Sequence, residues 1–303
     1  MTAGTATRAI GVVRERTGRG AAYLLIPAIL VVVVFLLVPV ALLVARSFSD
    51  SPAGNPDLLP LTWDNYGAIL ESWGYYLGRF GKTLLLAGLG ALLGALVAYP
   101  LALGIVSTRS RALRFTYVFF ALTPLLVSVV IRTFGWQVIL GPTGPVGQFA
   151  PGTNGFLSSD LAVVIGLGHL ATPFVLLSLL PVLDNLDHSL IRAARGLGAG
   201  AVRVFLKVVL TMSMPGLVAG ILVSFSVGAT VVVTPQLLGG RQNQLVPNLI
   251  FDQMAQFFDW NLAASLSTLL MLMIGVVSFV IGLLESWLSP LARARRAVAL
   301  SGR

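Results

Sequence analysis

Few side chains in this sequence could carry chemistry, and they are scattered along the chain. The 303 residues include 11 acidic residues, two histidines and no cysteine, so disulfide and thiol chemistry is excluded. The glycines of GLGAG, residues 196–200, are not followed by the Lys-Ser/Thr pair of a phosphate-binding loop. The sequence has no HExxH motif and no close grouping of histidine with carboxylates. We therefore expect a chain that is not an enzyme and binds no metal or cofactor itself.

Three ionisable residues stand within apolar stretches or at their ends: Arg132, His169 and Glu285. Ionisable groups inside a membrane are costly and often functional. For Arg132 the alternatives are a functional role within the membrane, snorkelling to the membrane surface, or capping of a helix. For His169 they are a functional role or a hydrogen bond between helices, and Glu285 is expected to pair near the membrane surface.

The composition indicates an integral membrane protein. Hydrophobic residues make up 56% of the chain and charged residues only 10%, whereas soluble domains carry about 25% charged residues. The formal charge of +9 fits basic loops on the cytoplasmic face of a membrane. We therefore expect membrane lipid, and no nucleic acid, as a partner.

Six uncharged runs are long enough, or nearly so, for spanning helices of about 20 residues. They cover residues 20–45, 83–108, 115–131, 161–183, 208–240 and 260–284. The third run is short and could extend past Arg132, and TPQLLGG at the end of the fifth is expected to be an outer loop. Apolar runs without alternation exclude a transmembrane barrel. The sequence thus predicts an all-α integral membrane fold with six transmembrane helices.

Basic residues favour one side of this topology. Six spans place both termini and the loops after the second and fourth spans together, with most of the 20 Lys and Arg residues. These are Arg8, Arg14, Arg16, Arg19, Arg109, Arg111, Arg114, Arg192, Arg195, Arg203, Lys207, Arg293, Arg295, Arg296 and Arg303. Because cytoplasmic loops are rich in Lys and Arg, we predict a multi-pass protein of the bacterial cell membrane. Residues 1–20 and 290–303 are then cytoplasmic tails around a transmembrane domain of residues 21–289.

The outer side holds aromatic residues and a set of candidates for the solute path. The aromatic residues are interpreted as an interfacial belt rather than as ligand contacts: Trp63, Tyr66, Trp73, Tyr75, Tyr76, Trp136 and Trp260. The candidate pathway residues are Arg132, Phe134, Trp136, Thr230, Thr234 and Gln236. No carboxylate stands at mid-depth, so a cationic solute would need acidic groups from a second subunit, or aromatic faces such as Phe134 and Trp136.

A basic segment with a glycine-rich bend lies between the fourth and fifth runs. Asp184 and Asp187 precede a predicted helix over residues 186–195 and are suited to cap it. Glycines 196, 198 and 200 then predict a bend, and a second helix would carry Val202, Phe205, Leu206 and Val209 on one face. The segment is either a basic helix lying on lipid or a docking helix for a cytoplasmic protein. The three glycines and the Met-Pro-Gly sequence at 214–216 favour docking.

The same segment, SLIRAARGLGAGAVRVFLKVVLTMSMPGL, resembles the EAA loop of permease subunits of type I bacterial ABC importers. The resemblance implies a loop at about residues 184–210 that docks on a separate ATPase subunit. The implied docking residues are Arg192, Ala193, Ala194, Arg195, Leu197, Gly198, Ala199, Phe205, Pro215 and Gly216. Arg192 stands where the family usually has Glu and Thr211 where it often has Pro, so the docking surface changes sign locally.

Further stretches are similar to a permease subunit of spermidine/putrescine importers. They are TPLLVSVVIRTFGWQVILGPTGPVGQ (123–148), residues 161–187, VTPQLLGG (233–240) and NLIFDQMAQFFDWNLAASLS (248–267). This resemblance implies a second permease subunit, an extracytoplasmic solute-binding protein and a dimer of ABC ATPase subunits that bind ATP and Mg. It implies a polyamine as solute. The alternatives are another small organic solute or a stand-alone secondary transporter, which would show coupling carboxylates or an internal repeat.

Overall fold

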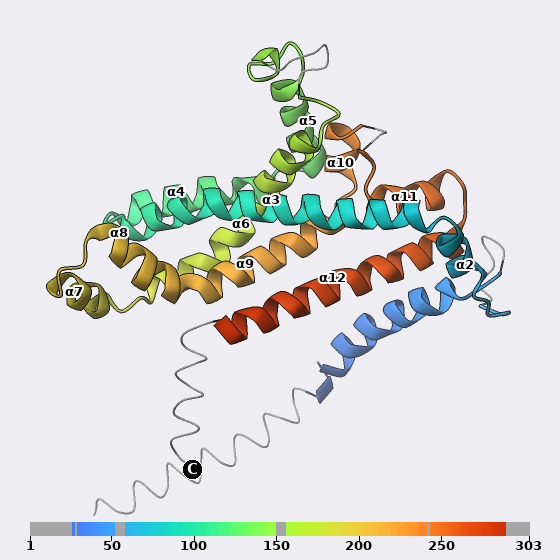
Figure 1. The fold of residues 1–303 in the computed structure, drawn as a ribbon, viewed down its shortest axis with the longest axis horizontal. Helices are drawn as coiled ribbons and strands as arrows, with labels where there is room; N and C mark the ends of the chain where they lie inside the picture. Colours follow the sequence, from blue (N-terminus) through green and yellow to red (C-terminus); the bar gives the residue numbers. More distant parts are fainter. Residues whose placement is uncertain (1–25, 28, 52–57, 150–155, 241–242, 289–303) are drawn as a thin grey trace, which may run out of the picture.

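The computed structural model describes residues 26–27, 29–51, 58–149, 156–240 and 243–288. The predicted tails, 1–20 and 290–303, lie outside this part of the chain. Apart from one isolated bridge between Ser49 and Leu61, the regular structure described is helical, which confirms the predicted all-α fold. Figure 1 shows long helices side by side, with short helices at both ends of the bundle.

The elements follow the chain in a simple order. After the N-terminal helix Ile29–Ser47, they are α2 (Asp64–Glu71), α3 (Trp73–Ser107), α4 (Arg111–Leu126), α5 (Val129–Leu140), the short η1 (Gly147–Phe149), α6 (Asp160–Asp184), α7 (His188–Gly196), α8 (Ala201–Val204), the π-helix η2 (Phe205–Val209), α9 (Leu210–Thr230), α10 (Val233–Leu238), α11 (Val246–Ala255) and α12 (Trp260–Leu288). Helices α8, η2 and α9 are continuous over Ala201–Thr230.

Five helices are long and apolar enough to cross a membrane: the N-terminal helix, α3, α6, the continuous helix Ala201–Thr230 and α12. The third predicted run falls on α4 and α5, which meet at an angle of 98° and are long and apolar enough to cross a membrane only when taken together. Val127 and Ser128 between them adopt extended backbone with ψ near 134° and 137°. The third run therefore does continue past Arg132, but as a second helix in a new direction (Figure 1).

The TPQLLGG segment is not the loop predicted from span length. Most of it forms α10, whose Thr234, Pro235 and Leu238 are buried. Gly166 of α6 leaves room for this helix, since a Cβ there would lie 2.6 Å from the Thr234 methyl group and 2.7 Å from Leu238 Cδ1. Packing against α6, which span length cannot reveal, gives this segment its regular structure.

Small residues bring α3 against α6. Gly90, Gly94, Ala98 and Ala102 recur every fourth position of α3 and are buried, so they form one stripe along the helix. A Cβ on Gly90 would lie 2.6 Å from Leu167 Cβ, and one on Gly94 would overlap Ala171 Cβ. Helix association in a membrane relies on such close packing, because lipid is as apolar as the side chains.

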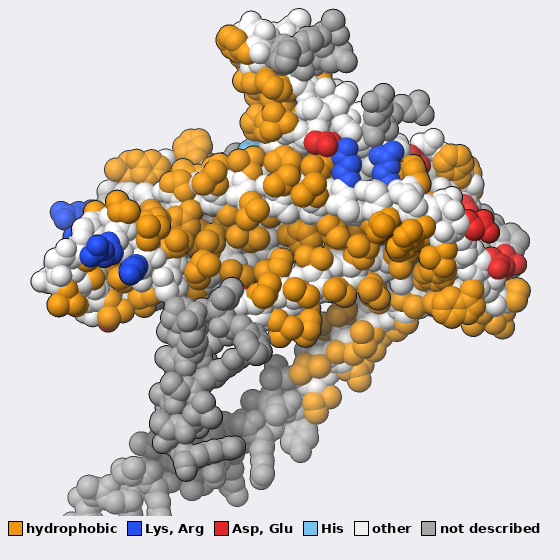
Figure 2. Space-filling model, in the orientation of Figure 1, with side chains coloured by type: hydrophobic (Ala, Val, Ile, Leu, Met, Phe, Trp, Pro, Cys, Tyr) orange, Lys and Arg blue, Asp and Glu red, His pale blue; other side chains and the backbone are white. Residues whose placement is uncertain are grey.

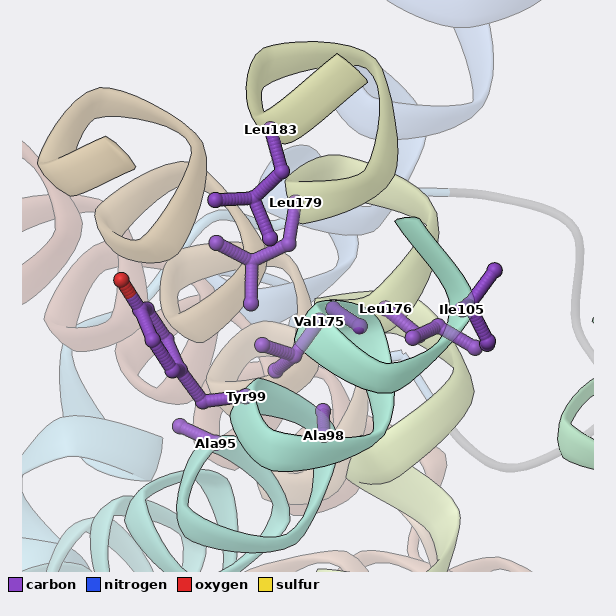
Figure 3. Packing of buried hydrophobic residues seen from close by; sticks show 9 residues of the cluster. Ala95, Ala98, Tyr99, Ile105, Val175, Leu176, Leu179 and Leu183 are labelled. Atoms are coloured by element: carbon purple, nitrogen blue, oxygen red, sulfur yellow. The ribbon is translucent and has the colours of Figure 1, made fainter. Parts of the chain in front are cut away.

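Helix α9 completes a three-helix block with α3 and α6. A Cβ on Gly220 of α9 would lie 2.7 Å from the Val175 Cα atom of α6. The hydroxyls of Tyr99 in α3 and Ser213 in α9 are 2.7 Å apart and form a buried hydrogen bond. Figure 3 shows Tyr99 and Ala98 of α3 beside Val175 and Leu179 of α6 in the core of this block.

The two ends of the bundle differ in charge. One end carries α7 and α8 and is called the α7 end; the other carries α2 and α11 and is called the α11 end (Figure 1). Figure 2 shows basic side chains over α7 and α8, whereas both acidic and basic side chains lie at the α11 end. Arg114 and Asp184 form an ion pair at the α7 end.

The close contact of α3 and α6 can be tested with a single added methyl group. We expect Gly94→Ala to lower the free energy of unfolding by about 1–3 kcal/mol, because the new Cβ overlaps Ala171. Gly88→Ala is the matched control, since no atom lies within 4 Å of its added Cβ. Thermal unfolding of both purified variants in detergent measures the difference, and equal melting temperatures would contradict the assigned packing.

Candidate functional site

Residues 187–209 form a helix–bend–helix at the α7 end, which we call the elbow. Its first helix, α7, begins after Asp187, whose Oδ1 accepts a hydrogen bond of 2.8 Å from the Ser189 backbone N–H. This confirms Asp187 as the predicted cap. The second part, α8, begins at Ala201 and continues through η2 into α9.

Gly198 makes the bend of the elbow. Its φ of +81° lies in the left-handed region, which glycine adopts without steric cost. The Gly198 N–H donates to the Arg195 carbonyl at 2.9 Å and the Ala199 N–H to the Ala194 carbonyl at 3.1 Å. This pair of bonds is the Schellman motif that ends many helices. The bend predicted from the three glycines is thus confirmed, and one of them, Gly198, has the left-handed backbone that other residues rarely adopt.

The tip of the elbow is exposed and mixed in character. The Leu197 side chain is 89% exposed, and Arg192, Ala193 and Arg195 are also exposed. A groove of about 590 Å³ beside the tip is lined by residues that include Gly198, Val202, Arg203, Leu206 and Lys207. The tip therefore offers apolar and basic groups together, as a surface for a protein or for lipid would.

The predicted apolar face of the second elbow helix is wrong. Phe205 and Val209 do pack against the core of the bundle, but buried Val204 joins them. Val202 and Leu206 are 72% and 51% exposed. The reason is η2, in which the backbone hydrogen bonds skip one residue more than in an α-helix, so residues on either side of it no longer share one α-helical face.

Three of the predicted docking residues lie where the elbow joins the bundle. The Phe205 ring packs edge-on against Tyr99 of α3, with centroids 5.7 Å apart. Gly216 is buried, and a Cβ on it would lie 2.8 Å from the Ser178 carbonyl oxygen of α6. Pro215 lies within α9. These residues fix the elbow to α3 and α6, whereas residues 192–199 form its exposed surface.

The break between α4 and α5 brings Arg132, Trp136 and His169 together. They line a groove of about 440 Å³ with Phe120, Thr123 and Pro124. Arg132 Nη1 donates a 2.6 Å hydrogen bond to the Pro124 carbonyl near the end of α4, so this residue caps a helix, one of the alternatives considered for it. Trp136 Nε1 donates to His169 Nδ1 at 2.9 Å, which confirms a hydrogen bond between helices. The placement of Trp136 in an interfacial belt stays a prediction.

The other candidate pathway residues lie elsewhere. Thr230 lines a separate groove of about 380 Å³ between α9, α11 and α12. Thr234 is buried, with its hydroxyl 3.4 Å from that of Thr133. Phe134 and Gln236 are exposed and line neither groove. The six residues proposed from the sequence thus line no single groove within this chain, and their place along a solute path stays a prediction.

Sequence reasoning missed two hydroxyls of the Thr230 groove and left one acidic residue unsettled. Ser226 of α9 and Ser267 of α12 line this groove; Ser226 stands one helical turn before Thr230, a spacing that could have indicated it. Glu285 has no ion-pair partner within the described residues, so its expected pairing stays a prediction.

The sequence of this chain matches a protein family and individual relatives. Residues 90–294, more than half of the chain, match the family described as "Binding-protein-dependent transport system inner membrane component". The chain is 29% identical over 252 residues to the spermidine/putrescine transport system permease protein PotB of Haemophilus influenzae, covering 81% of this chain and 87% of that one. PotB of Escherichia coli is 26% identical, with 82% and 91% covered.

The fold has counterparts among solved transporters. A bacterial ABC transporter that imports the acidic polysaccharide alginate matches with a TM-score of 0.68 at 17% identity, covering 91% of this chain and 97% of that one. The MetNI methionine ABC transporter matches with a TM-score of 0.52 at 17% identity, covering 72% and 95%. The fold is thus that of a type I ABC importer permease, as the elbow predicted. The chain belongs to the family of binding-protein-dependent transport system inner membrane components.

Proposed function

We propose that this chain is the permease subunit of an ATP-driven importer of polyamines such as spermidine and putrescine. The observation that carries the proposal is the exposed elbow, hinged at Gly198 and fixed to the bundle through Phe205. The relatives named as spermidine/putrescine permeases support the choice of solute. The fold alone does not indicate the solute, because the matching solved structures are an alginate importer and a methionine transporter.

The charges of the two ends support an orientation. We place the α7 end with its basic elbow in the cytoplasm, together with both termini, because cytoplasmic loops are rich in Lys and Arg. The α11 end then faces a solute-binding protein outside the membrane. A solved alginate transporter forms such a complex with a periplasmic protein. A second permease subunit would cover helices such as α12, of which little is buried in this chain alone.

In this proposal ATP and Mg are bound by a dimer of separate ATPase subunits, and the elbow transmits their motion. The exposed tip around Leu197 contacts the ATPase. Because Arg192 stands where the family usually has Glu, the ATPase would have to offer it a hydrogen-bond acceptor. A displacement of the tip passes through Phe205 to Tyr99 and through the Tyr99–Ser213 hydrogen bond to α9. The block of α3, α6 and α9 then moves as a rigid body, so that the solute path opens in turn to each side of the membrane.

Two alternatives were left open by the sequence. Another small organic solute in the same importer class remains the second candidate, since related folds carry chemically different solutes. A stand-alone secondary transporter is not favoured, because the matching family consists of components of binding-protein-dependent systems.

The docking role of the elbow predicts a position-specific effect of a bulky residue. We expect Gly198→Val to abolish uptake and ATPase co-purification while membrane insertion persists, because valine is strained at φ +81°. Gly104→Val is the matched control: it adds the same side chain to a glycine of α3 outside the elbow, where the Cβ would meet no atom within 4 Å. Normal uptake by Gly198→Val would refute the docking role.

The proposed solute predicts the specificity of the partner binding protein. We expect isothermal titration calorimetry of the solute-binding protein encoded beside this permease to detect binding of spermidine or putrescine. Amino acids and other organic cations serve as comparison ligands. Binding of one of these, with no polyamine bound, would leave the importer assignment standing and overturn the solute.

A further inference from the structure

A pocket of about 350 Å³ opens at the α11 end, between the start of α3 and helix α11. Its lining includes Tyr75, Tyr76, Gln244, Asp252, Gln256 and Phe257. None of these residues belongs to the elbow, to the groove at the α4–α5 break or to the Thr230 groove. Its volume falls in the range of small-molecule sites, about 300–1,000 Å³.

The Asp252 carboxylate is held in place by neutral groups. Its Oδ2 accepts a 3.0 Å hydrogen bond from Gln244 Nε2, and its Oδ1 accepts one of 2.7 Å from Gln256 Nε2. Among the described residues the ion pairs are Lys82 with Asp160 and Arg114 with Asp184, and neither pair includes Asp252. Because both glutamines donate their N–H groups, their side-chain oxygens are left as further acceptors.

Aromatic rings form the rest of the wall. Tyr75 and Tyr76 pack edge to face with centroids 5.3 Å apart, and Phe257 is 67% exposed. The Arg79 guanidinium lies over the Tyr75 ring, 5.2 Å from its centroid, and donates a 3.0 Å hydrogen bond to the Gln244 carbonyl. Arg79 thus places one positive charge beside the Tyr75 ring.

These groups fit a ligand that has only donors and positive charge. A carboxylate and amide oxygens accept N–H bonds from an ammonium group, and ring faces attract the ammonium charge. Apolar wall residues such as Leu249 suit a methylene chain. We infer that this pocket binds an organic polycation, with Asp252 as its counter-ion. This inference rests on the proposed function: the pocket is the acidic site where a polyamine first contacts this chain. Asp252 supplies a carboxylate, which the candidate pathway residues predicted from the sequence lack.

The test uses the complete transporter, with its ATPase and second permease, in lipid nanodiscs without the binding protein. Direct binding of spermidine is measured by calorimetry. We expect Asp252→Asn to weaken binding about tenfold, the loss typical of one hydrogen bond to a charged group. Glu71→Gln is the matched control, since it removes the same charge from exposed α2 outside the pocket, and it should bind spermidine as the natural chain does.

A second pair of variants tests the aromatic wall without changing formal charge. We expect Phe257→Leu to weaken spermidine binding about threefold, because the exposed Phe257 ring offers a cation–π contact that leucine does not. Phe257→Tyr keeps the ring face and should bind as the natural chain does. Thermal unfolding of each variant checks that the change in binding is not a change in folding.

The outcomes separate the pocket from the proposed function. A natural transporter that imports no spermidine, with its binding protein present, overturns the proposed solute. If it imports spermidine, but Asp252→Asn binds it as tightly as Glu71→Gln does, only the pocket assignment is overturned. The same holds if Asp252→Asn changes only the concentration of binding protein needed for half-maximal uptake, because the pocket is then a protein-docking surface.

Discussion

The close approach of α3 to α6 is the interaction on which the other features of this chain depend. Inside a membrane apolar side chains gain nothing by leaving lipid, so helices associate through packing and a few hydrogen bonds. Gly90 and Gly94 let α3 come so near α6 that an added Cβ would collide with Leu167 or Ala171. Gly216 and Gly220 do the same for α9 against α6. The result is a block of three helices that can transmit a displacement.

The elbow is useful only because it is joined to this block. Its tip is exposed, but Phe205 packs on Tyr99, and Tyr99 in turn bonds Ser213 on α9. The π-helix η2 lies at this junction and turns Phe205 and Val209 inward while Leu206 remains exposed. Short π-helical turns often occur at functional sites, and here the turn allows one continuous helix to have both an exposed surface and a packed face.

Charge is kept away from the middle of the bundle and used at its ends. Arg132 is nearly buried, but it caps the Pro124 carbonyl where α4 breaks. The basic tip of the elbow lies at the α7 end and the Asp252 pocket at the α11 end, on opposite sides of the bundle (Figure 1). A charge in lipid is expensive, whereas the same charge at an end is partly hydrated and free to attract a partner. This distribution fits a chain that moves a charged solute while a separate subunit supplies the energy.

The sequence by itself determined the features that depend on local patterns: the helical class, the apolar spans, the Asp187 cap, the bend at Gly198 and the family resemblance of the elbow. The spacing of Gly90, Gly94, Ala98 and Ala102 was also readable, since one helix face repeats about every fourth residue. Only the tertiary structure decided the 98° break after α4, the Trp136–His169 hydrogen bond and the pocket around Asp252. The hydrogen bond and the pocket join residues far apart in the chain, and their geometry follows from how the helices pack, which periodicity and composition do not contain.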